Sequence, residues 1–145
     1  MSKEENLNLV RRFFEEVANG RRDDLAESLL TQDHRYIDPQ RPDVQPGPAE
    51  TVRALKDYQN GVEGHWQIDD IFAADDDRVV VLWTGTGRHT GEISGIPPTG
   101  RSIRVSAISV MKIRDGKIAE HRCNWDTLGF LQQLGVVPMP MDRAA

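Results

Sequence analysis

The spacing of hydrophobic residues changes near Gly64, and this change limits the possible folds more than any other feature. Before Gly64, apolar side chains recur every three or four residues, as they do on one face of a helix. After it, long segments alternate apolar and polar side chains, which is typical of strands that bury one face. Helices followed by antiparallel strands predict an α+β fold whose helices pack on one side of a sheet.

Short local patterns predict where the early helices begin and end. Ser2 and Glu5 have the spacing of a capping box, and Gly20 is well placed to end this first helix. A short second helix is expected from about Asp23, whose carboxylate can cap it, through Leu30.

A proline-rich stretch separates these helices from a third. Residues 31–46 contain three prolines, which prevent a long helix and favour an extended, ordered loop. Gly47-Pro48 then begins the third helix, because proline is tolerated in the first turn of a helix.

The second half of the chain predicts a curved sheet. Residues 79–84 are a β-branched run that continues through glycines, which suggest a bend or bulge. Strands at residues 103–113 and 117–125 are joined by Asp115-Gly116, a strong hairpin signal. A last helix, residues 127–134, is expected to follow. A bent sheet closed by helices forms a cone, and one alternating face of each strand lines its interior.

Length and composition predict one soluble domain over residues 1–145, with a core of about residues 5–137 and a flexible tail, residues 138–145. The formal charge of −5 argues against general affinity for nucleic acid or anionic membranes. Cys123 is the only cysteine, which rules out an internal disulfide and suits the cytoplasm.

Several motifs, in their order along the chain, resemble the SnoaL-like polyketide cyclases. Each is weak alone, but the ordered set covers nearly the whole chain. Residues 95–101 are the most specific segment. The set comprises Gly20-Arg21-Arg22-Asp23-Asp24, Tyr36-Ile37-Asp38-Pro39, Gly87-Arg88-His89-Thr90-Gly91, Gly95-Ile96-Pro97-Pro98-Thr99-Gly100-Arg101, Asp115-Gly116-Lys117-Ile118-Ala119-Glu120-His121-Arg122, Asp126 and Leu131-Gln132-Gln133-Leu134-Gly135.

The resemblance implies a nuclear-transport-factor-2-like cone fold, often dimeric through the open sheet. It also implies an intramolecular aldol reaction that closes a ring in a polyketide ester, without a metal or organic cofactor. In the family a buried aspartate on the last strand removes the substrate's proton; here that position is Cys123. Asp38 replaces an asparagine, and Ala107 and Ser109 replace polar pocket residues, so the cyclase mechanism does not transfer intact.

Four residues are candidates for chemistry, and each has a plainer alternative. Asp38 could be the replacement acid/base, or it could form an Asx-turn before Pro39. His121 could be a general base, a partner of Asp38 or an oxyanion donor, or it could be a structural histidine. Cys123 could be a nucleophile or base, but a small buried wall residue is the commoner role. Asp126 could reach the cavity mouth, although an N-cap of the last helix is favoured.

The predicted apolar wall consists of aromatic and strand residues that face inward. Tyr36 could also donate a hydrogen bond to a ligand carbonyl. His34 and His89 are weaker candidates, with His89 expected near the surface, and no metal site is assigned because zinc-ligand spacing is absent. The predicted substrate-binding residues are Tyr36, Trp66, Trp83, Ala107, Ser109, Met111 and Trp125, with Phe72 as a further wall residue.

These observations leave two functional hypotheses. The first is a cofactor-independent cyclase or isomerase, formally a lyase or isomerase, that acts on a polyketide-like or other carbonyl-rich molecule. The second is a non-catalytic protein of the same fold that binds a small apolar ligand, since the usual catalytic position is Cys123. In both, the partner is a small apolar or aromatic carbonyl compound, and a homodimer is expected through the sheet face of Arg104, Ser106, Ile108 and Val110.

Overall fold

The computed structural model describes residues 2–138. The tail that was expected to be flexible therefore lies outside the described residues, except for Pro138. The helical segments are α1 (Lys3–Arg12), η1 (Phe13–Asn19), η2 (Asp23–Leu25), α2 (Ala26–Leu29), α3 (Pro48–Gly61) and α4 (Thr127–Gln133). The strands are β1 (Leu30–Ile37), β2 (Val62–Ala73), β3 (Arg78–His89), β4 (Ser102–Arg114) and β5 (Lys117–Trp125).

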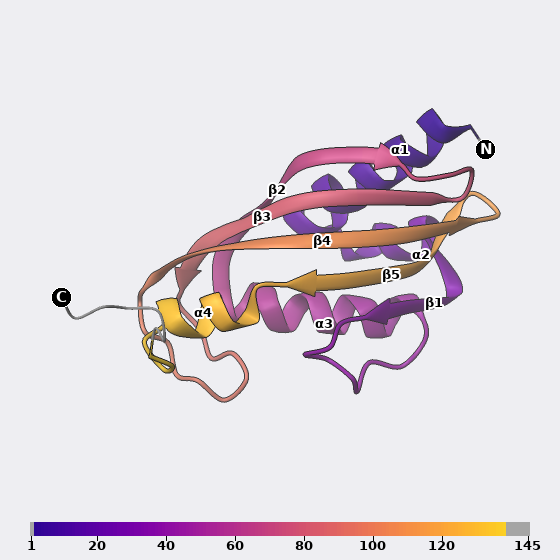
Figure 1. Cartoon of the computed structure of the whole chain (residues 1–145). Coiled ribbons are helices and arrows are strands. Elements are labelled where there is room, and N and C mark those ends of the chain that lie inside the picture. Colours follow the sequence, from indigo (N-terminus) through magenta and orange to yellow (C-terminus); the bar gives the residue numbers. More distant parts are fainter. Residues whose placement is uncertain (1, 139–145) are drawn as a thin grey trace.

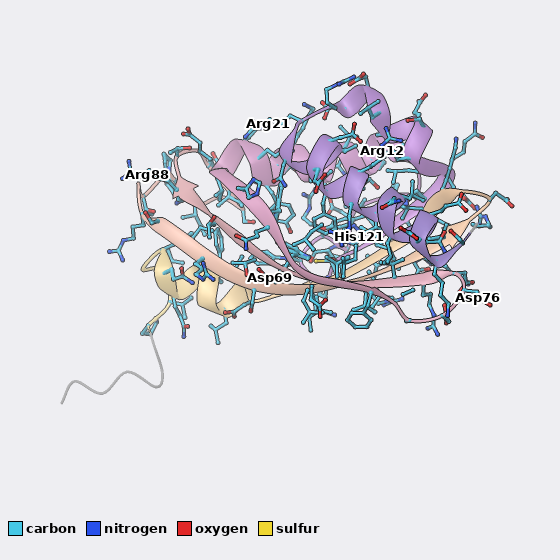
Figure 2. All side chains as sticks on the ribbon, turned by 90° about the horizontal axis from the view of Figure 1, so that it is seen from above. Arg12, Arg21, Asp69, Asp76, Arg88 and His121 are labelled. Atoms are coloured by element: carbon cyan, nitrogen blue, oxygen red, sulfur yellow. The ribbon has the colours of Figure 1, made fainter. Side chains whose placement is uncertain are left out.

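The five strands form one mixed sheet in the order β1-β5-β4-β3-β2, in which β1 and β5 are parallel and the other neighbours antiparallel. The long strands curve along their length, and α4 lies at one end of the sheet (Figure 1). The N-terminal helices lie on one side of the sheet (Figure 2). This arrangement confirms the predicted α+β fold with a curved sheet, and the parallel pairing of β1 with β5 makes that sheet mixed. No helix within residues 2–138 is long and apolar enough to cross a bilayer.

The predicted helix ends are confirmed for the first helix and only partly for the second. Ser2 and Glu5 form the capping box, and the helix ends at Gly20, although its last part, η1, is a π-helix. The second helix begins as a 3-10 turn in which Asp23 makes no capping hydrogen bond; its carboxylate pairs with Lys56 of α3 instead. Leu30 already belongs to β1, so this helix ends one residue earlier than expected.

Strand β1 replaces much of the loop that the prolines predicted. It pairs with β5 far along the chain, with Tyr36 opposite His121. A lone edge strand depends on that distant partner, and local sequence does not reveal the partner. The loop starts only at Asp38, and α3 then begins at Pro48 as predicted.

A register shift changes which side of β2 faces the helices. The shift lies between Ile68 and Asp70, whereas β3 passes through its glycines in regular register with both neighbours. Because side chains alternate along a strand, one extra residue exchanges the two faces. Ile71 therefore packs against the core and Phe72 is 44% exposed, so the prediction that Phe72 lines the interior was wrong.

The predicted hairpin and final helix are confirmed. Asp115 and Gly116 both have positive φ, at 52° and 75°, as a two-residue hairpin requires. Asp126 caps α4 by accepting a hydrogen bond from the Gly129 N–H at 2.9 Å. The alternate residues of β4 from Ile103 to Ile113 are all buried, as their spacing predicted.

Candidate functional site

A hollow walled mainly by aromatic rings lies between the helices and the sheet. Together with the open space at its mouth, it contains about 920 Å³ that is not filled by atoms. Arg21 and His65 are exposed and line the hollow, which places them at its mouth. The aromatic rings in the wall are Phe13, Phe14, Tyr36, Tyr58, Trp66, Trp83, Trp125 and Phe130.

The wall includes four of the seven predicted substrate-binding residues: Tyr36, Trp66, Trp83 and Trp125. The other three, Ala107, Ser109 and Met111, are buried behind this wall rather than on it. The indole of Trp83 covers Ser109, to which its Nε1–H donates a hydrogen bond at 2.9 Å. Ala107 and Ser109 are small and lie behind the large rings of neighbouring strands, whereas Met111 is a large side chain packed wholly inside the core.

Asp38 is a buried carboxylate at the end of β1, only 3% exposed. Its Oδ1 accepts the Gln40 N–H at 2.9 Å, which is the Asx-turn bond that the sequence allowed. Its Oδ2 accepts three more hydrogen bonds, from Tyr36 Oη at 3.0 Å, Tyr58 Oη at 2.7 Å and Trp125 Nε1 at 3.3 Å. The turn and the site thus use different oxygens of one carboxylate.

The donors of this cluster belong to the cavity wall, and Asp38 stands behind them. On its other side Asp38 borders a second, polar hollow under the loop of residues 38–47, lined also by Arg35 and Arg41. Burial raises the pKa of Tyr36, and burial followed by the hydrogen bond to Asp38 raises the pKa of Tyr58. Both phenols therefore remain protonated and hold their hydrogen bonds to the carboxylate.

His121 lies between the helices and the sheet (Figure 2) and is 5% exposed. Its Nε2 is 2.8 Å from Ser109 Oγ, while its Nδ1 is buried without a hydrogen-bond partner among the described residues. Burial, and then the nearby His34, lower the pKa of His121 to about 3. The imidazole is therefore neutral near pH 7 and is a poor general base there.

The structure does not join Asp38 and His121 in a hydrogen-bonded pair within residues 2–138. Tyr36 contacts both groups: its hydroxyl donates to Asp38, and its ring centroid lies 5.2 Å from that of His121. The idea of a direct carboxylate–imidazole pair was therefore wrong, because an aromatic side chain contacts both partners.

The remaining candidates have structural surroundings. Cys123 lines the cavity, and burial raises the pKa of its thiol to about 12, so the thiol stays protonated. Asp126 is exposed and caps α4, as the sequence favoured, and it is not among the residues that line the cavity.

His89 is fully buried, which contradicts its expected position near the surface. Its Nδ1 accepts the Thr99 N–H at 3.1 Å and so ties the end of β3 to the following loop. His34 is also fully buried, and its Nδ1 is 2.8 Å from the Ile118 carbonyl oxygen. Within residues 2–138, no three His, Cys, Asp or Glu side chains are grouped so as to hold a metal ion.

Sequence reasoning missed the contributions of three residues to this site. Tyr58 gives Asp38 its shortest hydrogen bond, and Phe13 and Phe14 both line the cavity. The adjacent phenylalanines begin the π-helical segment η1, a feature that is frequent at functional sites. Their pairing was visible in the sequence, but the change of helix type that points both rings at the cavity was not.

Comparisons with known proteins agree with this architecture. The sequence model of the SnoaL-like polyketide cyclases matches residues 8–134. The aklanonic acid methyl ester cyclase DauD of Streptomyces sp. (strain C5) is 36% identical over 136 residues, covering 89% of this chain and 81% of DauD. A second relative, the aklanonic acid methyl ester cyclase DnrD of Streptomyces peucetius, is 35% identical and covers 89% of this chain and 90% of DnrD.

Solved structures agree as well. TsrD from Streptomyces laurentii superposes with a TM-score of 0.82 at 28% identity, covering 94% of this chain and 99% of TsrD. IdmH from Streptomyces antibioticus has a TM-score of 0.76 at 25% identity and covers 89% and 97% of the two chains. By the extent of the family match and by its identity to these relatives, the chain belongs to the SnoaL-like polyketide cyclase family.

Proposed function

We propose that this chain is a cofactor-independent cyclase that closes a ring in an aromatic polyketide ester by acid–base chemistry. The observation that carries the proposal is the buried Asp38 carboxylate, which lies behind two phenols of an aromatic-walled cavity. A carboxylate in such a place is a proton acceptor close to a site for a planar, carbonyl-rich molecule.

The proposed reaction is an intramolecular aldol addition. A proton leaves a carbon that is acidified by neighbouring carbonyls, and the resulting enolate carbon attacks a ketone carbonyl of the same molecule. One carbon–carbon bond forms, and the new alkoxide takes up a proton, so the composition of the substrate does not change. The protein must accept one proton, return one proton and stabilise the enolate oxygen in between.

We assign the proton transfers to Asp38 through Tyr58. The Tyr58 hydroxyl already donates to Asp38 at 2.7 Å, so its oxygen can take the substrate proton as its own proton passes to the carboxylate. The reverse transfer returns a proton to the alkoxide. His121 is assigned as a neutral hydrogen-bond donor to the enolate oxygen, and Cys123 as an uncharged part of the wall.

The relatives suggest the substrate class for this proposal. DauD and DnrD are named for aklanonic acid methyl ester, and we propose an ester of that kind as the substrate here. We also propose a cytoplasmic location, which suits the single, buried and unpaired Cys123, and a homodimer formed through the outer face of the sheet.

The proposal is tested by incubating the purified chain with aklanonic acid methyl ester after dialysis against EDTA, and separating substrate from cyclised product by chromatography. We expect conversion well above the rate without protein, with no metal or cofactor added. Saturable quenching of tryptophan fluorescence by the ester without any conversion would instead identify a ligand-binding protein.

A further inference from the structure

Three side chains form a hydrogen-bonded row from β3 across β4 to β5. Trp83 Nε1–H donates to Ser109 Oγ at 2.9 Å, and Ser109 Oγ lies 2.8 Å from His121 Nε2. All three are at most 8% exposed, so water does not compete freely for these contacts. The row ends at His121 Nδ1, which is buried and unpartnered within the described residues, on a side chain that lines the cavity.

The position of each proton in this row follows from the chemistry of its members. An indole N–H only donates, so the Ser109 oxygen must accept from Trp83. The hydroxyl has one proton of its own, and its candidate acceptors are His121 Nε2 and the thiol of Cys123, which lies opposite Ser109 in the strand register. An imidazole nitrogen is a good acceptor and a thiol sulfur is a weak one, so the proton is donated to Nε2.

An imidazole that accepts at Nε2 and is neutral carries its only proton on Nδ1. We propose that Trp83 and Ser109 hold His121 in the Nδ1–H tautomer, so that this N–H is a cavity subsite for one carbonyl or enolate oxygen of the ligand. The role of the oxygen in turnover rests on the proposed function, but the tautomer and the subsite do not.

The surroundings of the imidazole explain why the ligand group is an uncharged or anionic oxygen. Phe13, Phe14 and Tyr36 lie around it, with ring centroids 5.2–6.4 Å from its own. None of these side chains forms a hydrogen bond with Nδ1, since the Tyr36 hydroxyl is bonded to Asp38, and a buried donor without a partner costs folding free energy. A ligand oxygen that enters between the rings would satisfy it, whereas a cationic group would be repelled by the N–H dipole.

In this scheme Ser109 is a positioning residue that acts through His121. It lies behind the cavity wall and orients the imidazole without touching the ligand. The family resemblance does not assign this role.

The tautomer can be measured directly by nitrogen-15 NMR of histidine-labelled protein, because protonated and unprotonated ring nitrogens have well separated shifts. The chain has four histidines, so His121→Phe identifies the signals of His121. We expect Nδ1 to be protonated in the wild type and the preference to weaken in Ser109→Ala. It should be retained in Ser109→Thr, and also in Ser106→Ala, which removes an exposed hydroxyl from the same strand. Protonation of His121 at Nε2 in the wild type would overturn the proposal, whatever the Ser109 variants show.

The subsite is tested with two probes of equal shape, 2-acetylnaphthalene and 2-isopropenylnaphthalene, by quenching of tryptophan fluorescence. The preference for the ketone should fall roughly three- to tenfold in His121→Phe relative to wild type, which is what one hydrogen bond contributes. An unchanged preference would overturn the subsite. Neither measurement requires turnover. If the Nδ1–H tautomer and the ketone preference are found but the ring is not closed, the proposed function is refuted and the subsite is not.

Discussion

At the scale of single residues, the burial of His34 and His121 has the clearest consequence, which is a pH-dependent stability. Burial lowers the pKa of His34, and lowers that of His121 to about 3. In the unfolded chain a histidine has a pKa near 6.5 and takes up a proton as the pH falls through that value. Between about pH 6.5 and pH 3 the unfolded state therefore binds more protons than the folded state does, and stability decreases as the pH falls.

We expect the free energy of unfolding to be constant between about pH 7 and pH 8 and to fall below pH 6.5, by at most about 1.4 kcal/mol per pH unit for each of His34 and His121. Urea unfolding at pH 7.5, 6 and 5 measures this slope above the range in which carboxylates titrate. His121→Phe should flatten the slope, whereas His65→Gln, at an exposed histidine, should not. An equal slope in wild type and His121→Phe would contradict a neutral buried imidazole.

Asp38 shows how far residue-level reasoning from sequence can reach. Its position before proline allowed both a turn and a catalytic role, and the structure shows that its two oxygens have separate partners. Tyr58 and Trp125 could not be predicted as its partners, because they come from a helix and a strand 20 and 87 residues away. Local signals identify a candidate carboxylate, but only the fold supplies the donors around it.

At the scale of elements, the sequence correctly predicted the features that residues close together in the chain form among themselves. The capping box of α1, the Asp115-Gly116 hairpin and the cap of α4 are all of this kind. Strand β1 and the β2 register shift were missed because both depend on pairing with distant strands.

Variants at the N-cap of α4 can distinguish a structural role of Asp126 from a catalytic one. Asp126→Ala should lower the free energy of unfolding by about 0.5–2 kcal/mol, because the Gly129 N–H loses its acceptor. Asp126→Ser should keep most of that stability, since serine also caps helices well. Both variants are expected to close the ring at the wild-type rate at temperatures where they are folded. A slow but fully stable Asp126→Ser would show that the carboxylate takes part in the chemistry.

At the scale of the whole molecule, the outer face of the sheet carries exposed apolar side chains among polar ones. Leu82 and Ile108 are cross-strand neighbours at 36% and 53% exposure, and Phe72 is 44% exposed on β2. Such a patch on a regular sheet is typical of a protein–protein contact. This is the face, with Arg104, Ser106 and Val110, for which the sequence predicted a homodimer.

We expect wild-type protein to have twice the chain mass by size-exclusion chromatography with light scattering. Ile108→Glu should shift it to a monomer, because an isologous contact places both copies of a substituted residue in one interface. Leu128→Glu introduces the same charge at an equally exposed leucine on α4 and should leave the mass unchanged. A wild-type monomer at micromolar concentration would contradict the dimer.

The cavity depends on how all strands and helices are placed, and the sequence predicted only part of its wall. Alternation along β4 and β5 correctly predicted which faces point inward. It did not predict that the rings of β2, β3 and α3 cover the small residues of β4, because that depends on the curvature of the sheet and on helix placement.

The central claim is that the Asp38 carboxylate, behind the cavity phenols, carries the proton in ring closure. The single-turnover rate of aklanonic acid methyl ester cyclisation tests it most directly, in Asp38→Asn and in Asp70→Asn, which changes an exposed carboxylate on β2. With thermal unfolding confirming that both variants are folded, we predict a loss of about 10²–10⁴-fold for Asp38→Asn and none for Asp70→Asn. Ring closure by folded Asp38→Asn at the wild-type rate would contradict the account.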